Sequence, residues 1–385
     1  MQRRVVFVLV LAALALAFGA ASASGSTPPP VDAGAVLVAD GRTGDVLYAE
    51  NADRRLPMAS ITKLMTALVT LERARPREVV TVAPQAVGQG GSSIFLVPGE
   101  ELRVRDLLAA ALVQSANDAA FALAAHVGEG DVARFVRLMN DEAAELGLGD
   151  TRFVRPDGLD RRGHYSTAED VFELARIAMR EPLVRELART RTMRVGNRSF
   201  RNWNDLLWTF PGLIGVKTGH TDRAGWAEVA AARRRSTLLY AVILGSPSRS
   251  ERNEDLAELL EWGFDQYARF TVVREGERYA SAAVPFSEER VGLVAAGGAS
   301  RVVRLGSGTT FVERIVAPAM VELPVRRGQK LGEVVVTDGE RVVARSDLVA
   351  ARDVEAPSFG DRVGWYADRA LDEAGDLLAA VVPGL

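Results

Sequence analysis

Ser60 and Lys63 are the two side chains whose types and spacing are best suited to chemistry. They lie three residues apart in the segment LPMASITKLMTA, which reads as the start of an apolar helix after Pro57, so both would share one helix face. A hydroxyl attacks poorly until a base takes its proton, and a lysine can be that base if burial and a nearby cation lower its pKa. Ser-x-x-Lys alone is weak evidence, because a solvated helix face can contain it by chance.

Two further motifs strengthen the chemical interpretation. The triplet SAN at 115–117 lies in an expected turn between two helices, and the triplet KTG at 217–219 lies at the end of an expected strand. The order Ser-x-x-Lys, Ser-x-Asn, Lys-Thr-Gly is the signature set of penicillin-binding proteins and serine β-lactamases. The sequence therefore predicts a serine nucleophile activated by lysine.

Lysine usage supports the same conclusion. The chain contains three lysines, Lys63, Lys217 and Lys330, and all its other cationic side chains, histidine aside, are arginines. Arginine keeps its proton under ordinary conditions, whereas a desolvated lysine can lose it. Two of the three lysines fall inside the motifs, as expected where a neutral amine or a compact ammonium group is needed.

Each motif residue then has an expected role. Ser60 would be the nucleophile and Lys63 its base. Lys217 would be the cation that lowers the pKa of Lys63. Ser115 would relay a proton towards the departing amine, and Asn117 would fix Lys63 and the substrate amide through hydrogen bonds. Backbone N–H groups at the helix start and at the strand that carries KTG would form an oxyanion hole, namely those of Ser60 and His220.

These residues resemble those of the D-alanyl-D-alanine carboxypeptidase family, the low-molecular-mass penicillin-binding proteins. The resemblance covers about residues 31 to 270, and the β-rich residues 271–355 resemble the C-terminal domain of the family. It implies an α/β fold of the penicillin-binding protein and serine β-lactamase type, in which an antiparallel sheet is flanked by helices and joined to a helical subdomain that carries SAN, followed by a small all-β domain. The segments that carry it occur in the order of the family: GSSIFLVPGEELRVRDLL, FVRPDGLDRRGHYSTAEDV, NWNDLL and GVKTGHTDRAGW.

The resemblance also implies an activity. The substrate would be a peptidoglycan stem pentapeptide ending in D-Ala-D-Ala, and Ser60 would release the last D-alanine through an acyl-enzyme that water hydrolyses. β-Lactam antibiotics would acylate the same serine. The terminal carboxylate would be bound by Lys217, Thr218 and Arg252, and Arg249 stays open as an alternative to Arg252. Gly219 and His220 would line the substrate site, and no cofactor or metal is expected.

Two rival functions stay open. A serine β-lactamase shares the three motifs, but it does not need a second domain, and no obvious glutamate-bearing deacylation loop is present. A non-catalytic wall-binding or penicillin-sensing module would share the fold, although the intact Ser60, Lys63 and Lys217 argue against it. Trp203 and Trp208 are expected to pack in the core rather than border the substrate groove.

Composition restricts the location and the partners. Residues 1–23 read as a signal peptide, with a basic start, an apolar stretch and a small-residue cleavage site, and 24–31 as a linker. The chain is therefore expected in the periplasm or at the outer face of the bacterial cytoplasmic membrane. A net charge of −3 gives no electrostatic case for nucleic acid, and the absence of cysteine excludes disulfides and thiol chemistry.

Three segments of the mature chain are expected to fold differently. Residues 32–270 would form the catalytic domain, closed by a helix over 254–270, and residues 271–355 would form the small all-β domain. Residues 356–385 have helical periodicity with an apolar stripe. That helix could contact a membrane surface through its apolar side, but its polar side is acidic, so packing on protein stays an equal alternative.

Overall fold

The structure, a computed structural model, describes residues 14–15 and 27–381, with side chains described for 27–371. Apart from residues 14–15, the expected signal peptide lies outside the described residues, as does the start of the expected linker. The chain divides into two compact units. One comprises Ser26–Gln266 and is called the α/β unit here; the other contains Tyr267–Leu385 and is called the β unit.

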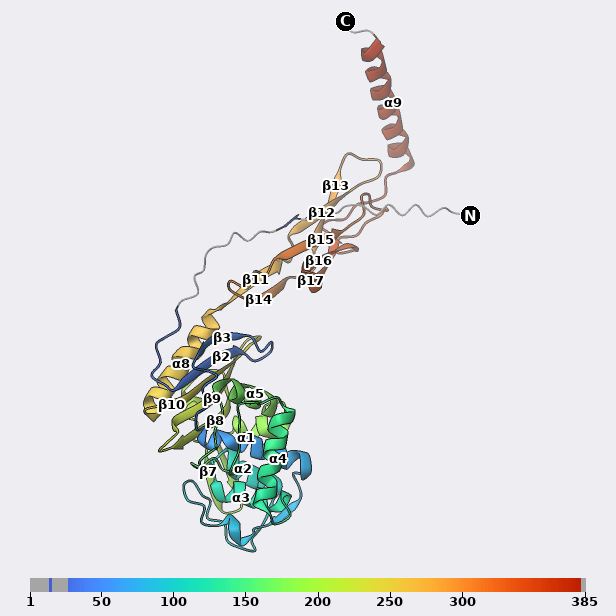
Figure 1. The fold of residues 1–385 in the computed structure, drawn as a ribbon. Helices are drawn as coiled ribbons and strands as arrows, with labels where there is room; N and C mark the ends of the chain where they lie inside the picture. Colours follow the sequence, from blue (N-terminus) through green and yellow to red (C-terminus); the bar gives the residue numbers. More distant parts are fainter. Residues whose placement is uncertain (1–13, 16–26, 382–385) are drawn as a thin grey trace. The chain divides into compact units, whose positions relative to one another are not determined.

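The centre of the α/β unit is a five-stranded antiparallel sheet in the order β3-β2-β10-β9-β8 (Figure 1). The inner strands are continuous apolar runs because helices cover both faces of the sheet. β8, which carries KTG, is an edge strand. The strands are β2 (Ala35–Asp40), β3 (Val46–Glu50), β8 (Leu213–Thr221), β9 (Gly225–Arg234) and β10 (Thr237–Ser246).

Neighbouring residues of β10 show that α8 (Arg249–Asp265) and α5 (Ala168–Ala178) cover opposite faces of the sheet. On one face, Gly263 of α8 packs so closely that an added Cβ would lie 2.8 Å from Leu239 Cδ1. On the other face, Phe172 of α5 makes an edge-on ring contact with Tyr240 at 5.6 Å. Because successive strand side chains point to opposite sides, these two contacts define the two faces.

The remaining helices of the α/β unit form the expected helical subdomain, and the SAN triplet lies at the turn between α2 and α3 (Figure 1). Its core is rich in alanine and leucine, so the helices pack closely. The helices are α1 (Lys63–Arg73), α2 (Val104–Leu112), α3 (Asn117–Val127), α4 (Val132–Glu145), α6 (Pro182–Ala188) and the short α7 (Leu206–Thr209). The 3-10 segments are η1 (Ala59–Thr62) and η2 (Pro84–Ala86), and two small ribbons pair β4 (Val79–Thr81) with β5 (Glu101–Arg103) and β6 (Thr192–Val195) with β7 (Arg198–Arg201).

The β unit follows directly. The helix expected over 254–270 is shorter than predicted, because α8 ends at Asp265 and the β-forming run YARFTVV pairs as β11 instead. A six-stranded sheet in the order β1-β15-β16-β17-β13-β12 and the β11–β14 pair enclose a separate apolar core. The strands are β1 (Leu14–Ala15), β11 (Tyr267–Val273), β12 (Arg278–Ala283), β13 (Arg290–Ala295), β14 (Ala299–Arg304), β15 (Phe311–Val316), β16 (Lys330–Asp338) and β17 (Arg341–Ala350).

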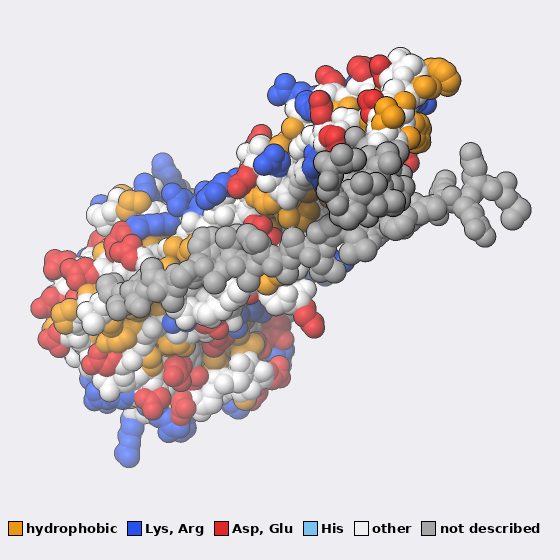
Figure 2. All heavy atoms as spheres, turned by 90° about the horizontal axis from the view of Figure 1, so that it is seen from above, with side chains coloured by type: hydrophobic (Ala, Val, Ile, Leu, Met, Phe, Trp, Pro, Cys, Tyr) orange, Lys and Arg blue, Asp and Glu red, His pale blue; other side chains and the backbone are white. Residues whose placement is uncertain are grey.

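The C-terminal segment is a helix, α9 (Phe359–Val381), as its periodicity predicts. Near its start, the ring of Phe286 in the β unit contacts Trp365 and Tyr366. Within residues 14–15 and 27–381, no helix is both long enough and apolar enough to cross a membrane. On the face in Figure 2, acidic and basic side chains both occur, in keeping with the net charge of −3.

Candidate active site

The backbone around Ser60 differs from the regular helix that the sequence predicts. Ser60 lies in η1, and α1 begins only at Lys63. Ala59 has a φ of 47°, a conformation that is costly for a residue with a side chain and is typical of functional sites. Gly158 is close to this turn, since a Cβ there would lie 1.9 Å from the carbonyl oxygen of Ala59. The turn before the serine therefore depends on close backbone packing.

Lys63 brings the first two motifs together. Its Nζ lies 2.8 Å from Ser60 Oγ and 2.7 Å from Asn117 Oδ1. A third partner, the backbone oxygen of Asp157, lies 2.7 Å away. The side chain of Lys63 is fully buried. All three polar contacts of the amine are thus made by fixed groups inside the protein.

Electrostatics favour the neutral form of Lys63 more than usual. Burial lowers its pKa to about 8, and the cation of Arg155 adds to the shift. The carboxylate of Asp157 opposes this shift. Asp157 is itself paired with Arg155 at 2.8 Å, which keeps its pKa low despite its burial. A lysine in this environment can give up its proton near neutral pH.

The second lysine occupies the other wall of the site. Lys217 Nζ lies 3.0 Å from Ser115 Oγ and 2.8 Å from the backbone oxygen of Thr218. Only 2% of Lys217 is exposed, and burial lowers its pKa, with the charge of Lys63 as the next cause. The charge of Lys63 therefore disfavours the ammonium form of Lys217, whereas the cation that adds to the shift of Lys63 is Arg155. The structure brings Ser60, Lys63, Ser115, Asn117 and Lys217 into one site.

The SAN turn is held by an adjacent loop. Ser115 has a φ of 62°, so the turn bends sharply before α3 begins at Asn117. The side-chain N–H of Asn117 donates to the oxygen of Gly90 at 2.8 Å, and its backbone N–H donates to the oxygen of Ser92 at 2.7 Å. These bonds fix the Asn117 amide so that its oxygen faces Lys63.

Asp118 continues this support. Its carboxylate is buried and accepts hydrogen bonds from the backbone N–H groups of Ile94, at 3.1 Å, and Leu96, at 3.0 Å. It also accepts one from Ser93 Oγ at 2.5 Å. Sequence reasoning did not assign a role to Asp118, although an acidic residue in the first turn of α3 is a recognisable helix-start signal.

Gly219 allows β8 to approach the serine. A Cβ at Gly219 would lie 2.9 Å from Ala59 Cβ and 3.1 Å from the backbone nitrogen of Ser60. The motif glycine is therefore explained by close packing, because any side chain would push the strand away from η1. His220 follows at the exposed edge, where its ring stacks at 4.0 Å on the ring of Trp226.

Thr218 faces away from Lys217. It is opposite Glu228 of β9, while Lys217 is opposite Val229, so the side chains of Thr218 and Glu228 lie on the face of the sheet covered by α8. Glu228 is fully buried, and its Oε2 lies 3.2 Å from Nε of Arg252. Burial raises the pKa of Glu228 to about 7. Sequence reasoning missed Glu228, which looks like a solvent-facing strand residue in the segment WAEVAA.

The two candidate arginines differ in their surroundings. Arg252 is 1% exposed and donates to Asn253 Oδ1 from Nη2 at 2.6 Å, in addition to its contact with Glu228. Arg249 is more exposed and forms two hydrogen bonds of 2.7 Å with Asp205. Arg252 therefore lies on the face of the sheet that carries the Thr218 side chain, whereas the guanidinium group of Arg249 is already paired with the carboxylate of Asp205.

Two of the expectations about side-chain packing need correction. Trp203 and Trp208 are 42% and 37% exposed, so neither is a core residue. The indole N–H of Trp203 donates to the oxygen of Gln114, directly before the SAN triplet, and the ring of Trp208 packs under Arg201. Both rings use surface contacts that hydropathy alone does not predict.

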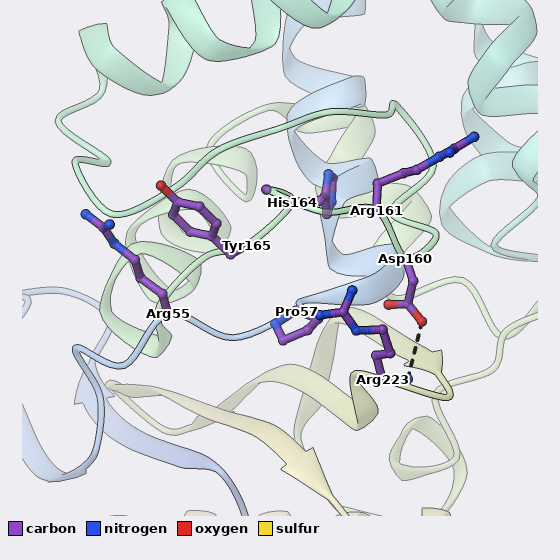
Figure 3. Close-up of a pocket in the computed structure, with 8 residues that line it drawn as sticks. Arg55, Pro57, Asp160, Arg161, His164, Tyr165 and Arg223 are labelled. Atoms are coloured by element: carbon purple, nitrogen blue, oxygen red, sulfur yellow. Dashed lines mark hydrogen bonds between the residues drawn. The ribbon is translucent and has the colours of Figure 1, made fainter.

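A separate pocket of about 200 Å³ lies on the same unit (Figure 3). It is lined by Pro57 near the serine turn and by Asp160, which accepts a hydrogen bond of 2.8 Å from Thr221 at the end of β8. His164 also borders it, and its Nε2 contacts Thr62 Oγ1 of η1 at 2.8 Å. In Figure 3 the guanidinium groups of Arg55 and Arg161 point away from Pro57. None of the motif side chains lines this pocket.

The relationship to known proteins agrees with this geometry. Residues 22–248 match the model of peptidase family S11, D-alanyl-D-alanine carboxypeptidase. The chain belongs to this family. Among its relatives is D-alanyl-D-alanine carboxypeptidase DacD of Salmonella typhimurium, which is 32% identical over 88% of this chain and 90% of that protein.

Solved structures of the family show the same fold. Penicillin-binding protein 5 of Haemophilus influenzae aligns with 86% of this chain and 100% of its own, at 29% identity and a TM-score of 0.62. The Streptomyces K15 DD-transpeptidase aligns with 62% of this chain and 99% of its own, at 31% identity and a TM-score of 0.60. The expected penicillin-binding protein fold with an antiparallel sheet and a separate all-β region is therefore confirmed.

Proposed function

We propose that this family member is an exported serine-type D-Ala-D-Ala carboxypeptidase that removes the terminal D-alanine of peptidoglycan stem pentapeptides through an acyl-enzyme on Ser60. One observation carries the proposal. The buried amine of Lys63 contacts the hydroxyl of Ser60, the amide of Asn117 and the backbone oxygen of Asp157 at 2.7 to 2.8 Å. These contacts match what a neutral amine acting as a base requires.

A neutral amine has two N–H groups and one lone pair. In Lys63 the two N–H groups can donate to Asn117 Oδ1 and to the oxygen of Asp157, so the lone pair is left for the hydroxyl proton of Ser60. Lys63 then takes this proton while Ser60 Oγ attacks the carbonyl carbon between the two D-alanines. Charged Lys63 would donate to all three oxygens and leave Ser60 without a base.

The tetrahedral intermediate needs donors for its oxygen and a proton for its leaving amine. In this proposal the backbone N–H groups of Ser60 and His220 form the oxyanion hole, and the close approach of Gly219 in β8 to the nitrogen of Ser60 supports this assignment. Ser115 contacts Lys217 at 3.0 Å, and we assign to it the transfer to the leaving nitrogen of the proton that Lys63 took from Ser60. Collapse breaks the C–N bond, releases D-alanine and leaves an ester on Ser60, which water hydrolyses.

The terminal carboxylate of the substrate is bound, in this proposal, by Thr218, Lys217 and Arg252. Carboxylate binding would offset the burial that lowers the pKa of Lys217 and would favour its ammonium form. β-Lactams carry a carboxylate beside a strained amide and are expected to acylate Ser60 as covalent inhibitors.

The direct test is D-alanine release. Purified protein is incubated with a stem pentapeptide, and free D-alanine is measured for wild type, Ser60→Ala and Lys330→Arg, whose lysine is an exposed residue of the β unit. Release by wild type and Lys330→Arg but not by Ser60→Ala supports the proposal. Fast hydrolysis of penicillin without D-alanine release would instead support a β-lactamase.

The location and the membrane contact are also proposals. The segment 1–23 supports export, to the periplasm or the outer face of the cytoplasmic membrane. The exposed Val363, Tyr366 and Leu371 of α9 support contact with a membrane surface. Flotation with lipid vesicles, for the mature chain with and without residues 359–385, tests this contact. Equal flotation of both forms would contradict it.

A further inference from the structure

Glu228 is a buried acid with no part in the proposed chemistry. Its side chain is fully buried, and neither carboxylate oxygen accepts a hydrogen bond of good geometry from the described residues, although Asn204 lies beside it and favours its charged form. A buried carboxylate with so little compensation is costly for stability. Its position in the sheet, beside Arg252 of α8, suggests which interaction offsets the cost of burying this carboxylate.

Glu228 connects the KTG strand to α8. It is opposite Thr218 in the sheet, and its Oε2 lies 3.2 Å from Nε of Arg252. The next residue on the same face of β9, Trp226, is opposite His220, and its ring lies 5.7 Å from Cζ of Arg252. Glu228 and Trp226 therefore hold the guanidinium group beside Thr218 and His220, their partners on β8.

Glu228 also affects the charge of the site. The negative charge of Glu228 favours the ammonium form of Lys217, whereas the positive charge of Arg252 disfavours it. Two buried cations near one strand repel each other, and a carboxylate near both of them reduces that repulsion. Without Glu228, the positive charge of Arg252 would disfavour the ammonium form of Lys217 more strongly.

We propose that Glu228 is a positioning residue for the terminal carboxylate of the substrate: it holds the guanidinium group of Arg252 beside Thr218 and offsets the repulsion between the charges of Arg252 and Lys217. The inference rests on the proposed function, because it concerns the carboxylate of that substrate. It predicts that Glu228 acts on recognition of the carboxylate and leaves the acylation chemistry of Ser60 intact.

The proposal also predicts a pH dependence. The charged and polar groups that act on Glu228 are Arg252 of α8, Asp205 with Asn204 from the segment before α7, and, from the other face of the sheet, Lys217 of β8. Of these, the two cations favour the ionised form of Glu228, and Asp205 opposes it. With a pKa of about 7, Glu228 is ionised above neutral pH and protonated below it. Carboxylate recognition should therefore strengthen as the pH rises through about 7.

The test compares two peptides that differ only at the end. One ends in D-Ala-D-Ala with a free carboxylate, and the other ends in the corresponding amide. The quantity is the ratio of kcat/KM for acid over amide, in which the titration of Lys63 cancels because it acts on both substrates. In wild type we expect the ratio to rise as the pH increases through about 7. In Glu228→Gln we expect the ratio not to change with pH. Above pH 7 the ratio of the variant should be about 10- to 30-fold lower than that of wild type, mainly because the KM for the acid peptide increases.

Two controls make the result decisive. Glu261→Gln removes another carboxylate that pairs α8 with β9, through Arg234, and should leave the ratio unchanged. Labelling of Ser60 by a fluorescent penicillin at long times reports whether the nucleophile works, so absent labelling in wild type marks failure of the proposed function instead. If Glu228→Gln does not fold, the wild-type pH series still decides. A flat wild-type ratio, or equal losses for acid and amide, would overturn the positioning role.

Discussion

The amine of Lys63 lies 2.8 Å from the hydroxyl of Ser60, at the point where η1 becomes α1. The other two contacts of the amine are both acceptors, Asn117 Oδ1 and the backbone oxygen of Asp157. This arrangement gives the serine a base only when the lysine has lost its proton. Replacement of Lys63 and variation of pH therefore probe the same relationship in two independent ways.

Lys63→Arg should abolish the base while retaining a cation. Arginine stays protonated, so the variant should lose about 10²- to 10⁴-fold in kcat/KM, the usual contribution of a general base. Steady-state D-alanine release from a pentapeptide measures the loss. Lys330→Arg is the matched control, and a Lys63→Arg variant as active as this control would contradict the base role.

The rise of kcat/KM with pH on the acid side of the profile should reflect the deprotonation of Lys63. Burial lowers its pKa to about 8, and only the deprotonated form is active as a base, so kcat/KM should rise with pH until about that value. Substrate release assays in overlapping buffers give the profile. An activity that falls as the pH increases from about 6 to 8 would exclude a neutral lysine as the base.

Gly219→Ala should displace β8 from the serine turn. The new methyl group would meet Ala59 Cβ at 2.9 Å and the nitrogen of Ser60 at 3.1 Å, so the strand must shift by a few tenths of an ångström. Small displacements of catalytic groups can cost about 10²-fold, and we expect a loss of that order in kcat/KM. Gly149→Ala, where an added Cβ meets nothing within 4 Å, is the control and should keep full activity.

His164 should make the fold sensitive to acid. Thr62 Oγ1 donates to the oxygen of Ala59 and so can accept from Nε2–H of His164, while Nδ1 accepts from the N–H of Val154. Both ring nitrogens are satisfied in the neutral form, and burial lowers the pKa of His164 to about 4.

The sign of the effect follows from this shift. The unfolded chain binds a proton at His164 below about pH 6.5 and the folded chain only below about pH 4, so stability is lost as the pH falls between these values. Between pH 7 and 5 the loss should be about 2 kcal/mol. Urea unfolding of wild type and His164→Gln measures it. An equal pH dependence of the two proteins would contradict a neutral buried His164.

Much of the site could be predicted from the sequence because its residues occur in short motifs with fixed local geometry. Ser60 and Lys63 are one turn apart, and the KTG strand was recognisable from its apolar run. Long-range partners could not be predicted in this way. The backbone oxygen of Asp157 reaches Lys63 through the packing of a distant loop, and Asp157 itself reads as a turn residue beside Gly158, although it is fully buried.

The same limit applies to Glu228. Its burial depends on which face of β9 is covered by α8, and on Arg252 arriving from that helix. An alternating strand pattern gives the faces but not the partner. The serine turn shows a third limit, because Ala59 takes a left-handed φ of 47° where the local sequence predicts an ordinary helix start. Gly158 and Gly219 pack closely against this turn, and both contacts come from segments distant in the sequence.

The most direct test of the central claim is the mass of the protein after reaction with penicillin, followed by peptide mapping. The mechanism predicts one penicilloyl group on Ser60 in wild type, none in Ser60→Ala, and much slower labelling in Lys63→Arg. A penicilloyl group on another residue, or labelling of Lys63→Arg as fast as wild type, would contradict the activation of Ser60 by Lys63.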